Sequence, residues 1–164
     1  MRILDYNRVV RDLNGLTVAG LLARIRESFD VAERSARVTP TQPETFGMCL
    51  AGQWYELTID PTLVPRGDPV ASLDVSLLHD RLLGPVLALG DPRTDARIDF
   101  VGGVRGLDEL ERRVQSGNAA VAFALHPTRM EQLMAVADAG KLMPPKSTWF
   151  EPKLADGLLS HVLD

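Results

Sequence analysis

Ala119-Ala-Val-Ala-Phe-Ala-Leu125 is the stretch that decides the fold. It is almost wholly apolar and has the length of one strand, which predicts a strand buried on both faces at the centre of a sheet. A predicted strand at 97–101 and a helix that ends at Gly117 precede it. Thr128-Arg-Met-Glu131 follows with the pattern of a capping box, which predicts a helix that ends near Gly140.

The N-terminal part continues the alternation of strands and helices. Hydrophobic spacing predicts a strand within 1–13, a helix capped by Thr17 that ends near Phe29, a polar loop at 33–44, a hairpin formed by 46–50 and 54–59, and a helix from Leu73 that stops at Gly84. We therefore expect one domain over residues 1–164, of α/β or α+β class. It has a mixed β-sheet, about four flanking helices and an extended proline-rich tail.

Composition narrows the class of protein. The chain has 164 residues and a net charge of −4, which argues against a generic nucleic-acid surface. Cys49 is the one cysteine, so a disulfide framework or a cysteine zinc site is not expected. The charged N-terminus does not resemble a signal peptide, and no apolar stretch approaches the ~20 residues of a membrane span. We expect a cytoplasmic protein without a membrane partner.

The proline-rich tail combines rigidity with groups that bind anions. Pro144, Pro145 and Pro152 lack N–H donors and favour extended backbone around them. Two cations and two hydroxyls lie within this frame beside two aromatic rings, namely Lys146, Ser147, Thr148 and Lys153 with Trp149 and Phe150. Two interpretations stand: a charge-assisted anion site, or a folded tail whose rings pack on the domain.

Gly102-Gly103-Val104-Arg105-Gly106 joins a predicted strand to a predicted helix. Free backbone N–H groups at such a helix start, with Arg105, can hold a phosphate. The spacing is neither a Walker loop nor a dinucleotide fingerprint, and Asp108 and Glu109 in the first helical turn repel anions. Glycines that serve only a tight strand-to-helix turn are therefore the competing interpretation.

Other charged positions are weaker candidates. Arg8 can clamp an anion if its strand turns it inward. The carboxylates of Asp91-Pro-Arg-Thr-Asp95, with Asp99, can hold Mg²⁺ together with a phosphate substrate, although such a sequence also forms an ordinary turn. The three histidines are far apart, and no serine-hydrolase or zinc-hydrolase signature is present.

Seven separated stretches match a known family. They are Ile3–Leu13, Leu73–Leu78, Asp91–Asp95, Asp99–Gly106, Val121–Leu125, Ala137–Gly140 and Met143–Lys153. Together they resemble the C-terminal half of the bacterial domain-of-unknown-function 1015 family. The tail motif Met-Pro-Pro-Lys-Ser-Thr-Trp-Phe-Glu-Pro-Lys is the most specific of them.

The resemblance implies a function for the longer family. Full-length members carry an Ala-Asp-Gly-His-His-Arg type of motif upstream, similar to a loop of ParB-like and free-serine-kinase proteins. It implies phosphoryl transfer to a small substrate such as serine, with Mg²⁺ and a nucleotide or pyrophosphate in the intact protein. This chain has no His-His pair. We therefore expect it to lack kinase activity alone.

Two function classes remain. The first is a domain that contributes an anion or phosphate subsite to phosphoryl transfer, built from Arg8, Gly102, Gly103, Arg105, Lys146, Ser147, Thr148 and Lys153. No catalytic residue and no metal ligand is assigned, and the expected ligand is a small anion. The second is a non-catalytic packing or assembly module that docks on an N-terminal half of the family or on another copy of itself.

Overall fold

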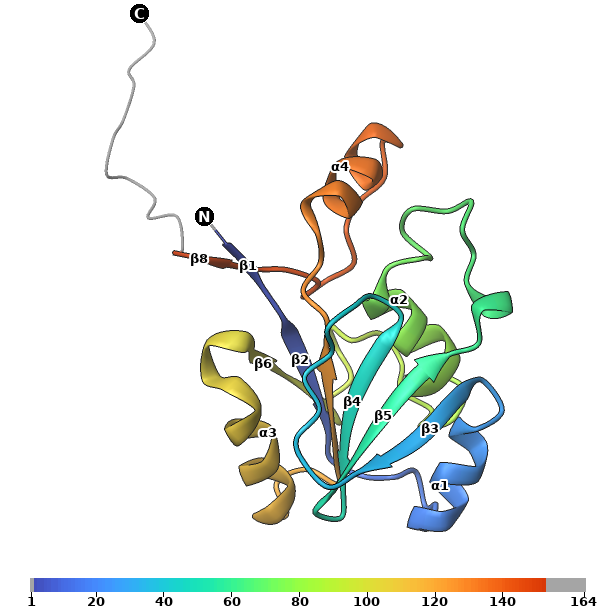
Figure 1. Cartoon of the computed structure of the whole chain (residues 1–164), viewed down its shortest axis with the longest axis vertical. Coiled ribbons are helices and arrows are strands. Elements are labelled where there is room, and N and C mark those ends of the chain that lie inside the picture. The colour runs from blue at the N-terminus through green and yellow to red at the C-terminus, as the bar shows by residue number, and fades with distance from the viewer. Residues whose placement is uncertain (1, 153–164) are drawn as a thin grey trace, which may run out of the picture.

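The computed structural model describes residues 2–152 and arranges them as an α+β domain (Figure 1). Six strands form the main sheet in the order β3-β5-β4-β7-β2-β6. Their bounds are β2 Tyr6–Val10, β3 Phe29–Arg34, β4 Thr45–Leu50, β5 Gln53–Ile59, β6 Ile98–Gly102 and β7 Val121–Leu125. The longer helices are α1 Val18–Ile25, α3 Gly106–Gln115 and α4 Met130–Asp138.

The strand predicted at the centre is confirmed. Every residue of β7 is buried, and the strand pairs with β4 on one side and β2 on the other. All pairings among the described strands are antiparallel, whereas the sequence predicted a mixed sheet. The reason is that β6 and β7, joined through α3, are both antiparallel to β2 and are separated by it. The helical crossover thus joins parallel strands that are not neighbours.

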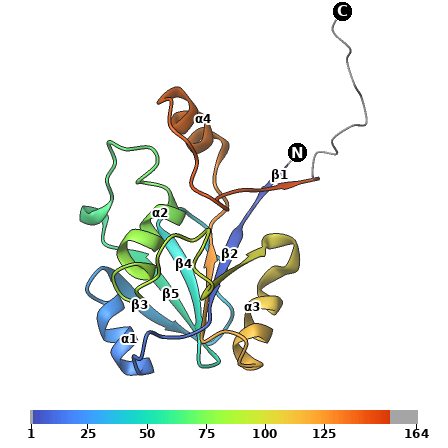
Figure 2. The same ribbon diagram turned by 180° about the vertical axis from the view of Figure 1, so that it is seen from behind.

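Helices cover both faces of the sheet (Figures 1 and 2). One face packs Phe46, Met48 and Phe123 against Leu21 of α1 and Leu78 of α2, which spans Asp74–Leu78. The opposite face packs Cys49, Ala122 and other small residues against Leu110 of α3. Alternating side chains of the same strands therefore enter two separate cores. No helix within residues 2–152 is long and apolar enough to cross a membrane.

Most N-terminal elements are confirmed, with one omission. Thr17 caps α1 by accepting a hydrogen bond from the Gly20 N–H at 3.1 Å, and β4 and β5 form the predicted hairpin. Strand β3 was not predicted. It lies at the edge of the sheet and pairs with β5, which is distant in sequence. Its exposed side chains include Asp30, Glu33 and Arg34, and this polar composition is not typical of a strand.

Two helices differ in detail from the prediction. The helix from Leu73 continues beyond α2 as a π-helix over His79–Leu83, in which the Gly84 N–H donates to the His79 carbonyl at 2.8 Å. Helix α4 is capped one residue later than predicted, at Arg129 rather than Thr128. The Thr128 hydroxyl instead donates to the Ser147 carbonyl at 2.9 Å, which ties the start of α4 to the tail.

The tail returns to the N-terminus. Strand β8 (Trp149–Glu151) pairs antiparallel with β1 (Arg2–Leu4) in a two-stranded ribbon beside the main sheet (Figure 2). The short connections η1 (Pro61–Leu63) and η3 (Gly103–Arg105) are 3₁₀ turns. The ribbon brings the two ends of the described chain together.

Asp74, the first residue of α2, is a buried carboxyl group. It accepts a hydrogen bond from the Glu44 N–H at 2.9 Å. Desolvation by burial outweighs this bond and raises the pKa of Asp74 from 3.8 to about 6. A carboxyl with a raised folded-state pKa binds its proton more tightly in the folded state. The free energy of unfolding therefore falls as pH rises from about 4 to about 6.

We predict that Asp74→Asn stabilises the protein at neutral pH. The amide oxygen still accepts a hydrogen bond from the Glu44 N–H, and the variant has no buried charge. Its free energy of unfolding at neutral pH should therefore be higher by at most about 3 kcal/mol. Thermal melts should show a higher Tm for the variant at pH 7.5 and little difference near pH 3.5. Asp138→Asn, at an exposed position of α4, is the control. Equal melting temperatures at both pH values would contradict the raised pKa.

Candidate functional site

The proline-rich tail and Tyr6 of β2 line an open pocket, which we call the tail pocket. Its lining residues are Tyr6, Met143, Pro144, Lys146, Ser147, Thr148, Trp149 and Phe150, around a volume of about 550 Å³. Tyr6 and Trp149 meet edge to face with ring centroids 5.3 Å apart. The pocket therefore combines aromatic walls with the polar residues of the tail motif.

Hydrogen bonds hold the tail loop in one conformation. The Ser147 hydroxyl donates to the Pro144 carbonyl at 2.8 Å, and the Ser147 carbonyl accepts from Thr128. Lys146 adopts a positive φ of 56°, in the left-handed region. Ser147 is buried. Its hydroxyl, which the sequence predicted to bind an anion, instead donates a hydrogen bond within the loop.

Lys146 and Thr148 keep their side-chain polar groups available. Neither side chain makes a hydrogen bond or ion pair with another residue of the range 2–152. The Lys146 ammonium lies 5.8 Å from the centroid of the Tyr6 ring, a cation–π distance. One cation and one hydroxyl of the predicted set thus border the tail pocket.

Arg8 lies beneath the tail loop and is only 4% exposed. Its guanidinium donates to the Lys146 carbonyl at 2.8 Å and to the Tyr6 carbonyl. It also stacks 5.1 Å from the centroid of Phe100. No carboxylate in the described part of the chain pairs with it. Burial lowers the pKa of Arg8 to about 10, so the side chain remains charged at neutral pH.

The glycines of the strand-to-helix loop allow close packing. A Cβ atom at Gly102 would lie 2.6 Å from Cε3 of Trp149. A Cβ at Gly103 would lie 2.0 Å from Oδ1 of Asp5. The Gly103 N–H donates to the Asp5 carbonyl at 2.8 Å. Gly102 thus supports the Trp149 wall of the tail pocket, and a carboxylate covers Gly103.

Arg105 does not border the tail pocket. Its side chain is exposed, and the adjacent glycines line a different pocket with Asp5 and His126. The sequence analysis grouped Arg105 with Lys146 in one subsite, whereas the fold brings together Arg8, Lys146, Ser147 and Thr148. Lys153 lies outside the described residues.

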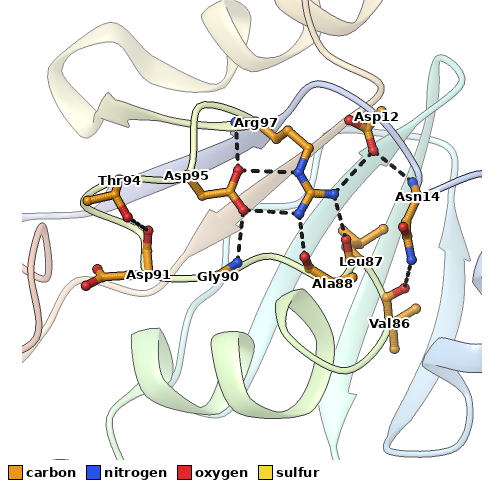
Figure 3. A network of polar contacts seen from close by, with 10 residues as sticks. All are labelled: Asp12, Asn14, Val86, Leu87, Ala88, Gly90, Asp91, Thr94, Asp95 and Arg97. Atoms are coloured by element: carbon orange, nitrogen blue, oxygen red, sulfur yellow. Dashed lines mark hydrogen bonds and ion pairs between the residues drawn. The ribbon is translucent and has the colours of Figure 1, made fainter.

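Arginine side chains pair with the carboxylates of the acidic loop after the π-helix, and Figure 3 shows one of them, Arg97. Asp91 pairs with Arg93 at 2.7 Å, and Asp95 pairs with Arg97 at 3.1 Å. These side-chain hydrogen bonds lower the pKa of both carboxyls to about 2. Asp99 pairs with Arg113 of α3. Within residues 2–152, no group of three or more His, Cys, Asp or Glu side chains is arranged to hold a metal ion.

Arg97 makes this loop a structural junction. It also donates to the Leu87 carbonyl at 3.1 Å and to the Ala88 carbonyl, and it lies 3.7 Å from Asp12 (Figure 3). One guanidinium therefore connects the end of β2 with the segments on either side of Asp91. The sequence favoured an ordinary turn or a Mg²⁺ site here, and the contacts are those of a turn.

Tyr6 is the member of the tail pocket that the sequence analysis did not select. The signal was available, because Tyr6 lies within the Ile3–Leu13 motif directly before Asn7 and Arg8. Asn7 is fully buried, and its side-chain carbonyl accepts from the Leu125 N–H at 3.0 Å. That bond fixes the strand end from which Tyr6 and Arg8 project.

Comparisons with known proteins agree with the sequence motifs and the fold. Residues 1–76, just under half of the chain, match the model of the family described as protein of unknown function (DUF1015). No curated protein matches the chain. Two solved structures, of two mutants of a free serine kinase in complex with AMP, match with a TM-score of 0.50 and 13% identity. Each match covers 90% of this chain and 53% of that chain, so this chain spans about half the length of the kinase.

We predict that Gly102→Ala displaces Trp149 from the tail pocket. The new methyl group would overlap the indole ring, whose six-membered part lies within 2.8 Å of the Cβ position. The Trp149 indole N–H resonance should shift and the Tm should fall by several degrees, since about 1–3 kcal/mol is the usual cost of overpacking. Gly67→Ala is the control, because nothing lies within 4 Å of its Cβ position. Equal spectra for the two variants would show that Gly102 does not support the ring.

Proposed function

We propose that this chain belongs to the DUF1015 family and that it binds a small phosphate-bearing ligand in the tail pocket. In the intact protein the pocket would serve phosphoryl transfer to a small substrate such as serine. The proposal rests on Lys146 and Thr148, whose side chains have no polar partner within residues 2–152. Both line a pocket of about 550 Å³, and the buried cation of Arg8 lies beneath the same loop.

Charge supports an anionic ligand. Lys146 is an exposed cation without a carboxylate partner in residues 2–152, and Arg8 adds a second positive charge through the loop that it supports. Arg8 is buried, so its charge is screened less by water than that of the exposed Lys146. A phosphate oxygen can accept from the Lys146 ammonium and the Thr148 hydroxyl together.

The aromatic walls support a flat group in the ligand. Tyr6, Trp149 and Phe150 border the pocket and present ring surfaces of the kind on which a nucleobase stacks. The free serine kinase of similar fold is in complex with AMP. A nucleotide with its phosphates at Lys146 and its base at the rings is therefore the ligand that we propose to test beside pyrophosphate.

The chemical role of these residues is positioning and neutralisation of charge. Phosphoryl transfer spreads charge over the phosphate oxygens, and fixed cations lower its barrier without forming a covalent bond. Residues of the tail pocket supply such a cation and a hydroxyl but no general base. We propose that the base belongs to the upstream half of the longer family members, so that this chain binds but does not turn over.

We predict that Lys146→Ala weakens binding of pyrophosphate and AMP about tenfold, the usual effect of losing one charge-assisted hydrogen bond. Thr148→Val should weaken it less, because a neutral donor is lost. Isothermal titration calorimetry with and without Mg²⁺ provides the measurement.

The matched control is Lys141→Ala. Lys141 is also an exposed lysine close to the tail, but it pairs with Asp68 at 2.7 Å and does not line the pocket. If the two lysine variants lose affinity equally, the ligand responds to net charge and the subsite is elsewhere. No binding to the unmodified chain would reject the proposal.

A second function, assembly, has its own observation. Met130 and Met134 lie four residues apart on α4 and are 45% and 55% exposed, and Leu142 beyond the helix is 89% exposed. Residues at this spacing share one helix face. The arm formed by α4 and the tail projects from the sheet (Figure 1), which leaves this face free for an N-terminal half or a second copy.

We predict that the chain associates through this face and that Met134→Glu abolishes the association. A charge in an apolar contact must be desolvated and opposes burial. Analytical ultracentrifugation of the wild type should show a concentration-dependent rise in mass that the variant lacks. Val104→Glu, at an exposed apolar residue on η3, is the control. A wild-type monomer at every concentration would remove self-association.

A further inference from the structure

A second cavity lies between the tail and the helices, and Arg8 is one of its lining residues. Its volume is about 200 Å³, and most of its lining is apolar, contributed by Val75, Leu83, Pro92, Ile98, Pro144 and Pro145. Its polar residues are Arg8, Ser76, His79 and Asp80. We call it the arginine cavity. A single water needs only about 10–15 Å³ of probe volume, so one water does not account for this space.

Arg8 places a positive charge at this cavity and pairs with no carboxylate of residues 2–152, although the exposed Asp80 lines the same cavity. Its guanidinium has five N–H donors, and the hydrogen bonds described above use carbonyls of Tyr6 and Lys146. A buried charge is costly unless a counter-charge compensates it. The carboxylates nearest in sequence, Asp5 and Asp12, are engaged elsewhere, by Asn7 and by Arg97.

His79 provides a second polar group. Its Nδ1 is the one buried side-chain nitrogen or oxygen atom in residues 2–152 that has no hydrogen-bond partner. His79 also begins the π-helix, whose residues Asp80 and Leu83 line the cavity as well. π-Helical turns are rare and occur frequently at functional sites. Arg8 and His79 therefore line one largely apolar cavity, and the unpartnered Nδ1 of His79 is buried at its wall.

We propose that the arginine cavity binds a compact monocarboxylate with an aliphatic body. The carboxylate accepts from the free N–H groups of Arg8 and, once the imidazole ring turns toward the cavity, from the Nδ1–H of His79. The aliphatic body packs on Val75, Leu83 and Ile98. Both this inference and the proposed function use the charge of Arg8, but the arginine cavity and the tail pocket share only Pro144 among their lining residues, so the methyl groups of Val75, Leu83 and Ile98 report on the arginine cavity alone.

The cavity favours one negative charge over several. Asp80 is exposed at the lining and repels a dianion or trianion, and the apolar walls cannot solvate additional phosphate oxygens. An uncharged ligand would leave Arg8 without a counter-charge. A monocarboxylate satisfies both conditions.

The test is an NMR titration of the full chain with labelled methyl groups. The ligand is 4-methylpentanoate, and its uncharged isostere 4-methylpentanamide is the matched control, with chloride used to hold ionic strength constant. We expect saturable shifts of the Val75, Leu83 and Ile98 methyl groups with a Kd of about 1 mM or below. The amide should bind at least about tenfold more weakly, because it lacks the charge that pairs with Arg8.

Variants test the two polar groups. Arg8→Met should reduce affinity for the carboxylate about tenfold or more and make the two ligands equivalent, whereas His79→Phe should reduce it a few-fold. Unchanged Leu21 methyl shifts show that each variant is folded. If Arg8→Met does not fold, the proposal is still tested by comparing the affinities of the wild type for 4-methylpentanoate and 4-methylpentanamide.

Three results would overturn the proposal. The first is the absence of saturation by the carboxylate at millimolar concentration. The second is equal affinity for the amide. The third has two forms. A response confined to Met143 and the Trp149 indole would place the carboxylate in the tail pocket. Tighter binding of inorganic phosphate, seen at the Val75, Leu83 and Ile98 methyl groups, would assign the arginine cavity to another anion.

Discussion

The buried guanidinium of Arg8 is the interaction on which both candidate sites depend. It joins strand β2 to the tail by donating to the carbonyls of Tyr6 and Lys146, and it carries a charge that no described carboxylate neutralises. A buried charge is costly to desolvate unless a counter-charge or hydrogen bonds compensate it. The binding of an anion is the role that we propose for this arginine.

The central part of the fold was predictable because its signal is local. The run from Ala119 to Leu125 can satisfy its apolar side chains only between two layers, and the structure places β7 there. The edge strand β3 was not predictable in this way, since it is polar and is specified by its pairing with β5. The order of the strands was not predictable either, because no pattern in the sequences of β6 and β7 indicates that β2 lies between them.

The candidate site was predicted in part for a related reason. The residue types in the tail indicated an anion site, and Lys146 and Thr148 border one pocket. Local sequence does not reveal that the Ser147 hydroxyl donates within its own loop or that Gly102 accommodates an indole ring. It also does not reveal that Arg105 lies outside the lining of the tail pocket. The arginine cavity was missed because its polar residues, Arg8 and His79, come from distant segments and form no spaced motif.

The ribbon of β1 and β8 has a consequence for the order in which the molecule opens. It pairs three residues with three at the margin of the domain, while the main sheet is buried on both faces. Local stability follows buried contacts, so amide protons of the ribbon should exchange with solvent before those of β7. Release of the ribbon would detach Trp149 from Gly102 and separate the walls of the tail pocket without unfolding the sheet. Forming the tail pocket requires the ribbon to be ordered, which costs conformational entropy. A ligand that binds in the pocket would stabilise the ordered ribbon and so hold the two ends of the described chain together.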